Sequence, residues 1–421
     1  MKKLTVFFCC FLILVSGTKA FTAAGKFPDK PLSFLHQDYV SDPPVETRPF
    51  QLSLVPMIGT EGRYTQDYIY NFSLNIFGGL TGGVDGLELG GFLNMNRYSM
   101  TGIQGSGFGN VVNGNTRGVQ MAGFFNVNNS FSEGLQAAGF VNVVNGGARL
   151  MQASGFVNVI NGNSRLLQGA GFGNIVNGNM DGIQAAGFAN INSGNTSGIQ
   201  VAGFGNVAGG KVAGIQAAGF GNIAPEVEGI QMAGFLNVAG TVKGIQLGFI
   251  NVADSIDGIP VGFLSIVRDG YRKLEISAGD AMNLNFGFKI GVRRFYNIFS
   301  IGTQFTGPES TFAYGYGIGS EFYRPDNRYL NIEILSHRFA EERWWSHDRV
   351  NMLNQLRVSF SRDMNERWQI FGGPVLNFHV SWDRENDRGA LDIAPYDLFS
   401  FSGQHTDTKV WFGINAGFRF W

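Results

Sequence analysis

Small or apolar residues alternate with polar residues along the middle of the chain, and the pattern repeats every sixteen residues. In residues 103–111, Ile103 and Gly105 fall on one parity, whereas Gln104 and Asn110 fall on the other. A period of two and a high glycine content exclude a helix and predict β-strands. Several units contain an Asn-Gly-Asn run, such as the one that begins at Asn113, which predicts a turn.

Three residue types recur at this step of sixteen, which shortens near the end of the repeats. The glutamine series includes Gln104, Gln120 and Gln136, the phenylalanine series includes Phe108, Phe124 and Phe140, and the asparagine series includes Asn110, Asn126 and Asn142. The unit reads approximately G-I-Q-x-A-G-F-x-N-V-x-N-G-x-x-x. A fixed period indicates one structural unit stacked many times. A ladder of like residues is typical of a scaffold, whereas an enzyme site needs a few unlike residues that converge.

The repeats predict a β-solenoid in which each unit forms one coil and coils stack about 4.8 Å apart. Like residues then lie above like residues. We expect the phenylalanine rings and the isoleucine and valine rows to fill a narrow core. We expect the asparagine and glutamine amides to form hydrogen bonds along the stack, since regular amide ladders require every group to be satisfied.

An alternative is a single large antiparallel outer-membrane β-barrel with one strand per unit, because the nine-residue alternation has a suitable length. The connections between units are all equal, whereas such barrels alternate short and long connections. Tyrosine and tryptophan are absent between Met100 and Gly270, so aromatic girdles are missing. The pattern therefore favours the solenoid.

The sequence after the repeats has longer amphipathic stretches, centred on residues 282–290, 295–304, 314–322, 329–335, 353–360, 368–382 and 410–420. The last of these resembles the closing strand of bacterial outer-membrane barrels, although Trp421 is out of phase with its apolar face. We therefore predict a C-terminal antiparallel barrel or sheet. The expected organisation is a signal peptide at 1–20, an extended leader at 21–48, flanking strands at 49–85, the solenoid at 86–267 and the barrel or sheet at 268–421. The flanking strands are also candidates for closing that barrel.

The first twenty residues have the features of a secretory signal peptide. Lys2 and Lys3 precede an apolar run at 4–16, and Ala20 ends a small-residue cleavage motif. Both cysteines, Cys9 and Cys10, lie inside this segment. The whole chain has 31 basic and 32 acidic residues, so its charge favours no nucleic-acid partner.

Candidate chemistry is sparse. The five histidines, His36, His337, His347, His379 and His405, show no metal-ligand spacing. No catalytic motif is present, so we expect no enzyme activity, no metal and no cofactor. The most distinctive non-repeat segment, residues 341–349, contains Trp344, Trp345 and His347 and is a candidate recognition loop. The pattern favours the alternative that its tryptophans anchor at a membrane interface or pack on the sheet.

Two consecutive runs, 229–238 and 244–254, carry the repeat motif in its clearest form. They resemble bacterial surface-repeat proteins of the GIQ-x-AGF-x-N type, which occur in secreted or outer-membrane proteins of Gram-negative bacteria. The resemblance implies an outer-membrane or cell-surface location and supplies no site residues. We predict a non-enzymatic surface repeat protein with a structural or adhesive role and an unidentified protein or glycan partner. The alternative is an outer-membrane pore or transporter-like barrel.

Overall fold

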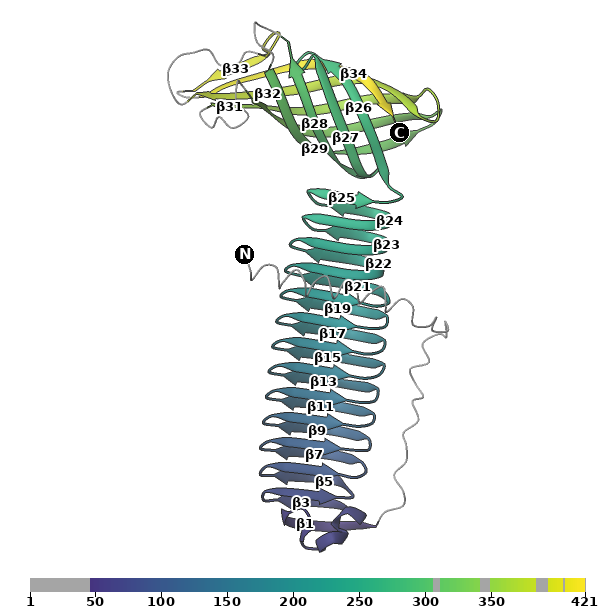
Figure 1. The fold of residues 1–421 in the computed structure, drawn as a ribbon, viewed down its shortest axis with the longest axis vertical. Coiled ribbons are helices and arrows are strands. Elements are labelled where there is room, and N and C mark those ends of the chain that lie inside the picture. The colour runs from purple at the N-terminus through teal and green to yellow at the C-terminus, as the bar shows by residue number, and fades with distance from the viewer. Residues whose placement is uncertain (1–45, 306–310, 341–348, 384–392, 404–405, 421) are drawn as a thin grey trace, which may run out of the picture. The chain divides into compact units, whose positions relative to one another are not determined.

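The computed structural model describes residues 46–305, 311–340, 349–383, 393–403 and 406–420. It contains a β-solenoid of about 12 turns followed by an eight-stranded antiparallel β-barrel (Figure 1). This confirms the predicted fold class. The chain divides into two compact units, of which the first ends at Gly234 and the second starts at Phe235. The predicted signal peptide, residues 21–45 of the leader, and Trp344, Trp345 and His347 lie outside the described residues.

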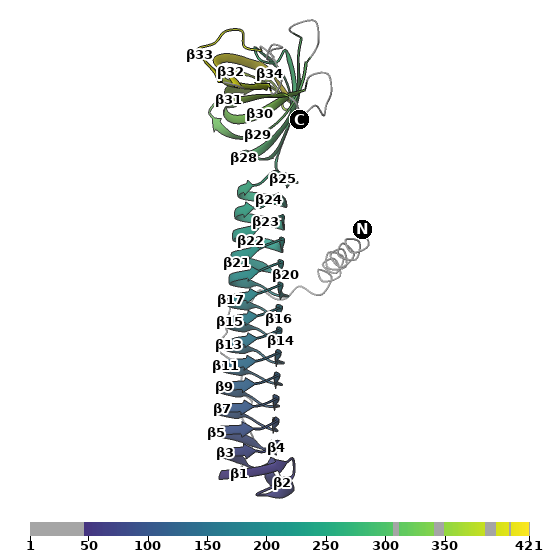
Figure 2. The same cartoon turned by 90° about the vertical axis from the view of Figure 1, so that its left-hand side faces the viewer.

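Most coils of the first unit contain one long and one short strand. Figure 2 shows the long and the short strands on opposite sides of the solenoid. The long strands are β5 (Gly83–Gly90), β7 (Met100–Ser106), β9 (Thr116–Ala122), β11 (Ser132–Ala138), β13 (Ala148–Ser154), β15 (Ser164–Ala170), β17 (Met180–Ala186), β19 (Thr196–Ala202) and β21 (Lys211–Ala218). The short strands are β4 (Gly78–Thr81), β6 (Leu93–Asn96), β8 (Gly109–Val112), β10 (Phe125–Asn128), β12 (Val141–Val144), β14 (Val157–Ile160), β16 (Gly173–Val176), β18 (Ala189–Asn192) and β20 (Gly205–Ala208).

Neighbouring coils pair in parallel and in register. Gln120 lies opposite Gln136, and Asn126 lies opposite Asn142. Parallel pairing excludes an antiparallel meander for these repeats and brings each residue beside its equivalent in the next coil. A glycine in each of several coils, such as Gly118 (φ 124°), lets the backbones approach. A Cβ atom at Gly118 would lie 2.0 Å from the carbonyl oxygen of Gly102.

The interior differs from the expected one. Gln104 and Asn110 are buried, whereas the phenylalanine rings lie on the outside, and Phe172 is 44% exposed. The chain leaves one sheet at Gly107 and Phe108 and enters the other, so the ring does not continue the parity of Gln104. The prediction that phenylalanine fills the core was therefore wrong, and so was the same prediction for the isoleucine of the repeat motif, since Ile103 and Ile183 are exposed. The apolar part of the core is a second set of inward residues: Val144, Ala148, Leu150, Ile160, Leu166, Val176 and Met180.

The early strands belong to the solenoid. β1 (Thr47–Val55) pairs in parallel with β3 (Ile69–Asn75), and β3 pairs in parallel with β5. The two-residue strand β2 (Ile58–Gly59) and the 3₁₀ helix η1 (Gly62–Asp67) lie between β1 and β3 in the chain. The alternative in which these strands help to close the C-terminal barrel was therefore wrong, because that barrel closes without them.

Longer strands form as the repeat shortens. They are β22 (Gly221–Ala233) in the first unit and β23 (Leu236–Leu247) and β24 (Ile250–Val261) in the second, followed by the short β25 (Leu264–Val267). β23 and β24 pair in parallel, and Pro260 lies opposite Gln246. A proline has no amide side chain, so the glutamine series ends at this position.

The barrel consists of antiparallel neighbours in chain order, closed by pairing of its first strand with its last. Its strands are β26 (Tyr271–Gly279), β27 (Leu284–Val292), β28 (Phe295–Gln304), β29 (Thr311–Arg324), β30 (Arg328–Ala340), β31 (Arg349–Asp363), β32 (Trp368–Asp383) and β34 (Thr406–Phe420), with a short β33 (Phe399–Ser402) paired to β34. Sequence patterning predicted seven of these strands within a few residues and missed β26.

Within the second unit, barrel strands cover the last coil. Asn297 of β28 accepts a hydrogen bond from the Ser265 backbone N–H at 2.9 Å and donates one to the Gly262 carbonyl oxygen at 2.8 Å. The ring of Tyr316 in β29 stacks on Phe263 with centroids 4.8 Å apart. The solenoid rings have a similar spacing, so Asn297 and Tyr316 take the places of a next asparagine and a next aromatic rung. Such caps protect the open end of a solenoid.

Candidate functional site

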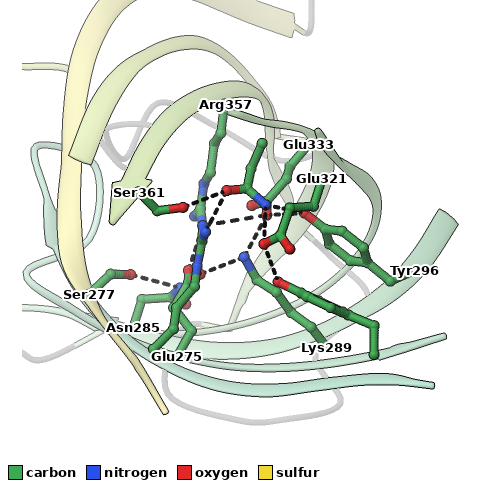
Figure 3. Close-up of polar contacts among 12 residues, drawn as sticks. Glu275, Ser277, Asn285, Lys289, Tyr296, Glu321, Glu333, Arg357 and Ser361 are labelled. Atoms are coloured by element: carbon green, nitrogen blue, oxygen red, sulfur yellow. Dashed lines mark hydrogen bonds and ion pairs between the residues drawn. The ribbon is translucent and has the colours of Figure 1, made fainter. Parts of the chain in front are cut away.

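The most concentrated polar chemistry in the described chain lies inside the barrel. Figure 3 shows charged side chains from several strands pointing toward one another. Glu275 comes from β26, Lys289 from β27, Glu333 from β30 and Arg357 from β31. Arg419 joins them from the last strand, β34, and all five side chains are buried. We call these five residues the barrel network.

Lys289 is central to the barrel network. Its Nζ lies 2.5 Å from Oε2 of Glu275 and 2.5 Å from Oε1 of Glu333. Arg419 Nε lies 2.8 Å from Glu275 Oε2, and Arg357 lies 3.7 Å from Glu275 Oε1. Buried charges are strongly unfavourable unless they are paired, so removal of one partner would leave others uncompensated.

Neutral groups extend the network toward one end of the barrel. Tyr296 donates its hydroxyl to Glu333 Oε1 at 2.7 Å, and Tyr271 donates to Glu321 Oε2 at 3.0 Å. Asn331 donates to that same Glu321 oxygen at 3.2 Å. Glu321 also forms an ion pair with the exposed Arg293 at 3.4 Å. The interior is thus a connected set of ion pairs and hydrogen bonds.

A histidine and a serine also meet inside the barrel. Ser300 Oγ lies 2.6 Å from His337 Nε2, and both residues are buried. A hydroxyl beside an imidazole is an arrangement that nucleophilic catalysis uses. Here the two groups have almost no exposed surface, and Gly315 packs against the His337 ring. The geometry therefore fits a packed interior pair.

The outer surface of the barrel has the opposite character. On β34, Phe412, Ile414 and Phe418 are exposed, whereas Trp411 and Arg419 are buried. The same alternation occurs around the barrel, with exposed apolar residues that include Phe286, Ile301, Phe312, Ile318, Phe322, Ile332, Ile334, Met352, Leu356, Phe360, Ile370 and Phe378. The barrel is therefore apolar outside, and its interior combines the barrel network with buried apolar residues such as Phe339, Leu353 and Trp411.

Two amide ladders run through the solenoid interior in opposite directions. In the glutamine ladder each Nε2 donates to Oε1 of the preceding coil, as Gln136 does to Gln120 at 2.7 Å. In the asparagine ladder each Nδ2 donates to Oδ1 of the following coil, as Asn126 does to Asn142 at 2.9 Å. Nδ2 of Asn126 also donates to the carbonyl oxygen of Ala137. Gln104, Gln120, Gln136, Asn110, Asn126 and Asn142 all belong to these ladders.

Glu88 stands where the glutamine ladder begins. Gln104 donates to its Oε2 at 2.7 Å, and Asn96 donates to the same oxygen at 3.0 Å. Asn75 donates to Oε1 at 3.0 Å. Burial raises the pKa of Glu88 above its usual range, while hydrogen bonds from Asn96, Gln104, Asn75 and Ser73 act in the opposite direction.

The phenylalanine series forms a third ladder on the outside of the solenoid. Phe108, Phe124 and Phe140 stack with centroids 5.2 Å and 4.8 Å apart and with nearly parallel rings. Stacked aromatic pairs contribute about 0.5–1.5 kcal/mol beyond their buried area. This ladder therefore stabilises neighbouring coils while it leaves apolar surface exposed.

Sequence reasoning missed the barrel network. The signal was present as charged residues on the parity opposite the apolar residues, for example Lys289 between Phe288 and Ile290. Alternation alone does not show whether that parity faces solvent or an interior. Closure of the sheet into a small barrel turns it inward, which brings together residues as distant in sequence as Glu275 and Arg419.

Comparisons with protein-family models, with curated proteins and with solved structures give no match for this chain. No helix in the described part of the chain has the length and apolarity needed to cross a membrane. Within the same residues, no group of three or more His, Cys, Asp or Glu side chains is placed to hold a metal ion.

Proposed function

We propose that this protein is a non-enzymatic outer-membrane protein in which the barrel is the membrane anchor and the solenoid is a structural element. The observation that carries the proposal is the reversed polarity of the barrel. Exposed side chains such as Phe360 and Ile414 are apolar, whereas Lys289, Arg357 and Arg419 are buried inside. A lipid-facing apolar band around a polar interior is the pattern of outer-membrane barrels.

Strand lengths support the same proposal. A transmembrane β-strand needs about 9–11 residues. The eight barrel strands range in length from 9 residues in β26 to 16 residues in β32, so each is long enough to cross a bilayer. Closure also matters, because pairing of β26 with β34 leaves no open edge, and an open edge is not tolerated in lipid.

The connections between strands suggest an orientation. One rim has the short turns 293–294, 325–327 and 364–367, whereas the other has 280–283 and the three longer connections that follow β28, β30 and β32. Short turns face the periplasm in outer-membrane barrels, and longer loops face outward. The segment before β26, which contains the solenoid, enters at the short-turn rim. We therefore propose a periplasmic solenoid, in contrast to the surface location that the sequence resemblance implies.

A pore is the second candidate, and the interior argues against it. The interior of an eight-stranded barrel is just wide enough for side chains. Here the barrel network spans it, with Lys289 bonded to Glu275 from β26 and Glu333 from β30. An open water-filled channel would require these ion pairs to separate. The geometry supports an anchor.

Fractionation of cells that express the full chain tests the membrane proposal. We expect the protein in the outer-membrane fraction, resistant to extraction by carbonate. In SDS without heating it should migrate as a compact folded band that shifts after boiling. Recovery in the soluble fraction, with no shift, would contradict a membrane barrel.

Conductance distinguishes the anchor from the pore. The purified full chain, reconstituted in planar bilayers, should give no stepwise conductance at moderate voltage. Reproducible single-channel steps from a preparation that shows the heat-dependent band would support the pore and overturn the closed interior.

A further inference from the structure

The outside of the solenoid has one polar edge and one apolar edge. The polar edge carries an exposed asparagine ladder, in which Asn145 donates to Asn129 and Asn161 donates to Asn145, each at 2.8 Å. Beside it lie ion pairs of mixed sign, such as Arg165 with Asp181 at 3.4 Å. These groups satisfy one another along the stack and are exposed to water.

The apolar edge lies around the Gly-Phe corners of the coils. On it the phenylalanine ladder is joined by a row of exposed aliphatic residues from the long strands, including Ile103, Leu135, Met151, Leu167 and Ile183. Between the two rows in chain order lies a row of mostly small residues, and a shallow groove of about 460 Å³ is lined there by Gly105, Met121, Ala137 and Ala153. The edge thus has two ridges and a groove.

The exposed area of this edge is larger than a monomer usually shows. A phenylalanine side chain presents roughly 200 Å², so six rings that are about two-fifths exposed give roughly 500 Å². The aliphatic row adds a similar area, for a total of about 1,000 Å². The largest apolar patch on a typical monomer is about 300–600 Å². A stable interface buries about 800 Å² on each partner, which this edge exceeds.

The spacing of the rungs restricts what fits the edge. The rings of Phe140, Phe156 and Phe172 repeat at 4.8 Å and 4.9 Å. A partner that fills every rung must present the same repeat over the same length, and a second copy of this chain does so. The mixed charges of the polar edge make a lipid surface a poorer fit, because helices and other elements that lie on anionic membranes carry mainly basic residues there.

We propose that the apolar edge is the contact surface between two copies of this chain, related by a two-fold axis, with ridges of one copy in the groove of the other. A two-fold contact uses the same patch on both copies. The phenylalanine ladder, which contributes little to the solenoid core, then becomes the centre of an interface. The inference goes beyond the proposed function and does not depend on the location of the barrel.

Cysteine cross-linking of the full chain tests this proposal. In a background with Cys9→Ala and Cys10→Ala, Ala153→Cys places one thiol in the groove, and Asn161→Cys places one on the polar edge as a control. Cell fractions are treated with a short flexible bis-maleimide, and denatured samples are separated by size. We expect most Ala153→Cys protein as a covalent dimer and the Asn161→Cys protein as a monomer.

A charge in the interface provides the second arm. Met151→Asp, added to the Ala153→Cys chain, should reduce cross-linking at least tenfold, because each dimer would bury two unpaired carboxylates. Asn161→Asp in the same chain should leave it unchanged. Absence of a dimer from Ala153→Cys, or equal dimer from both cysteine positions, would overturn the proposal and leave the edge to a lipid surface or another protein.

Discussion

An asparagine or glutamine can occupy a protein interior only when its amide is satisfied, and the regular stack provides that condition. Asn158 accepts a hydrogen bond from Asn142 and donates to Asn174, each at 2.9 Å. It donates its second N–H to the carbonyl oxygen of Gly169 at 2.8 Å. A buried carboxamide with these partners loses little relative to water, whereas each unpaired group would cost about 1–3 kcal/mol.

Asn158→Ala should therefore destabilise the solenoid by about 2–4 kcal/mol, because it leaves a donor on Asn142 and acceptors on Asn174 and Gly169 without partners. Asn161→Ala removes a hydrogen-bonded but exposed asparagine three positions later and should cost less than about 0.5 kcal/mol. Denaturant unfolding of both full-length variants, followed by circular dichroism, compares them. Equal shifts would mean that burial of the amide is not what stabilises the ladder.

The buried carboxyl of Glu88 should make the stability of the solenoid depend on pH. A glutamate in an unfolded chain has a pKa of about 4.3, and burial raises the pKa of Glu88 in the folded protein. The folded state then binds the proton more tightly, so this contribution is complete below the unfolded pKa and is lost as pH rises through the folded pKa. The unfolding free energy of the wild type, minus that of Glu88→Gln, should therefore fall as the pH rises above the unfolded pKa of about 4.3.

An exposed carboxyl provides the control for this titration. Asp181→Asn, on the polar edge, should produce a difference that stays nearly constant over the same pH range, since exposed ion pairs contribute little. A Glu88→Gln difference that rises with pH would contradict a raised pKa.

The residue series were readable from the sequence, but their orientation was not. A constant step of sixteen requires Gln136 to lie above Gln120 and Asn142 above Asn126, and the structure has these registers. Whether Phe124 points inward depends on where the chain leaves one sheet for the other. That turn uses Gly-Phe, which carries no strong turn signature, so alternation alone assigned the ring to the wrong side.

At the scale of elements, the long and the short strands of the solenoid form separate series, and both series pair in the same way. Within the repeats of the first unit, strands pair with their equivalents in the neighbouring coils, so the solenoid grows by repetition. The barrel strands instead pair with their sequence neighbours and depend on one closing contact between β26 and β34. Amphipathic alternation predicted most of these strands. Closure of the barrel and the inward direction of its charged side chains became visible only in the structure.

Lys289→Met tests the barrel network. It leaves Glu275 and Glu333 without their shortest cationic partner, so the barrel should lose about 3–5 kcal/mol. Arg324→Met changes an exposed cation at the end of β29 and should cost less than about 1 kcal/mol. The temperature at which the compact SDS-resistant band disappears measures both. Unchanged behaviour of Lys289→Met would show that the ion pairs do not hold the barrel together.

At the scale of the whole molecule, the barrel and the solenoid share a reversed distribution of polarity. Both place hydrogen-bonded or ion-paired side chains inside and leave apolar rows outside, as Lys289 and Phe360 do in the barrel and Asn158 and Phe172 do in the solenoid. The barrel exterior suits lipid, and the apolar edge of the solenoid suits a second copy.

The orientation of the chain across a membrane is the central claim, and one labelling measurement tests it. Phe401, in the connection between β32 and β34, is exposed at the rim with long connections, and Asn161 is exposed on the solenoid. With Cys9 and Cys10 replaced by alanine, Phe401→Cys and Asn161→Cys are treated on intact cells with a membrane-impermeant maleimide. We predict labelling of Phe401→Cys on intact cells and of Asn161→Cys only after the outer membrane is permeabilised. Labelling of Asn161→Cys on intact cells, or of neither variant, would contradict it.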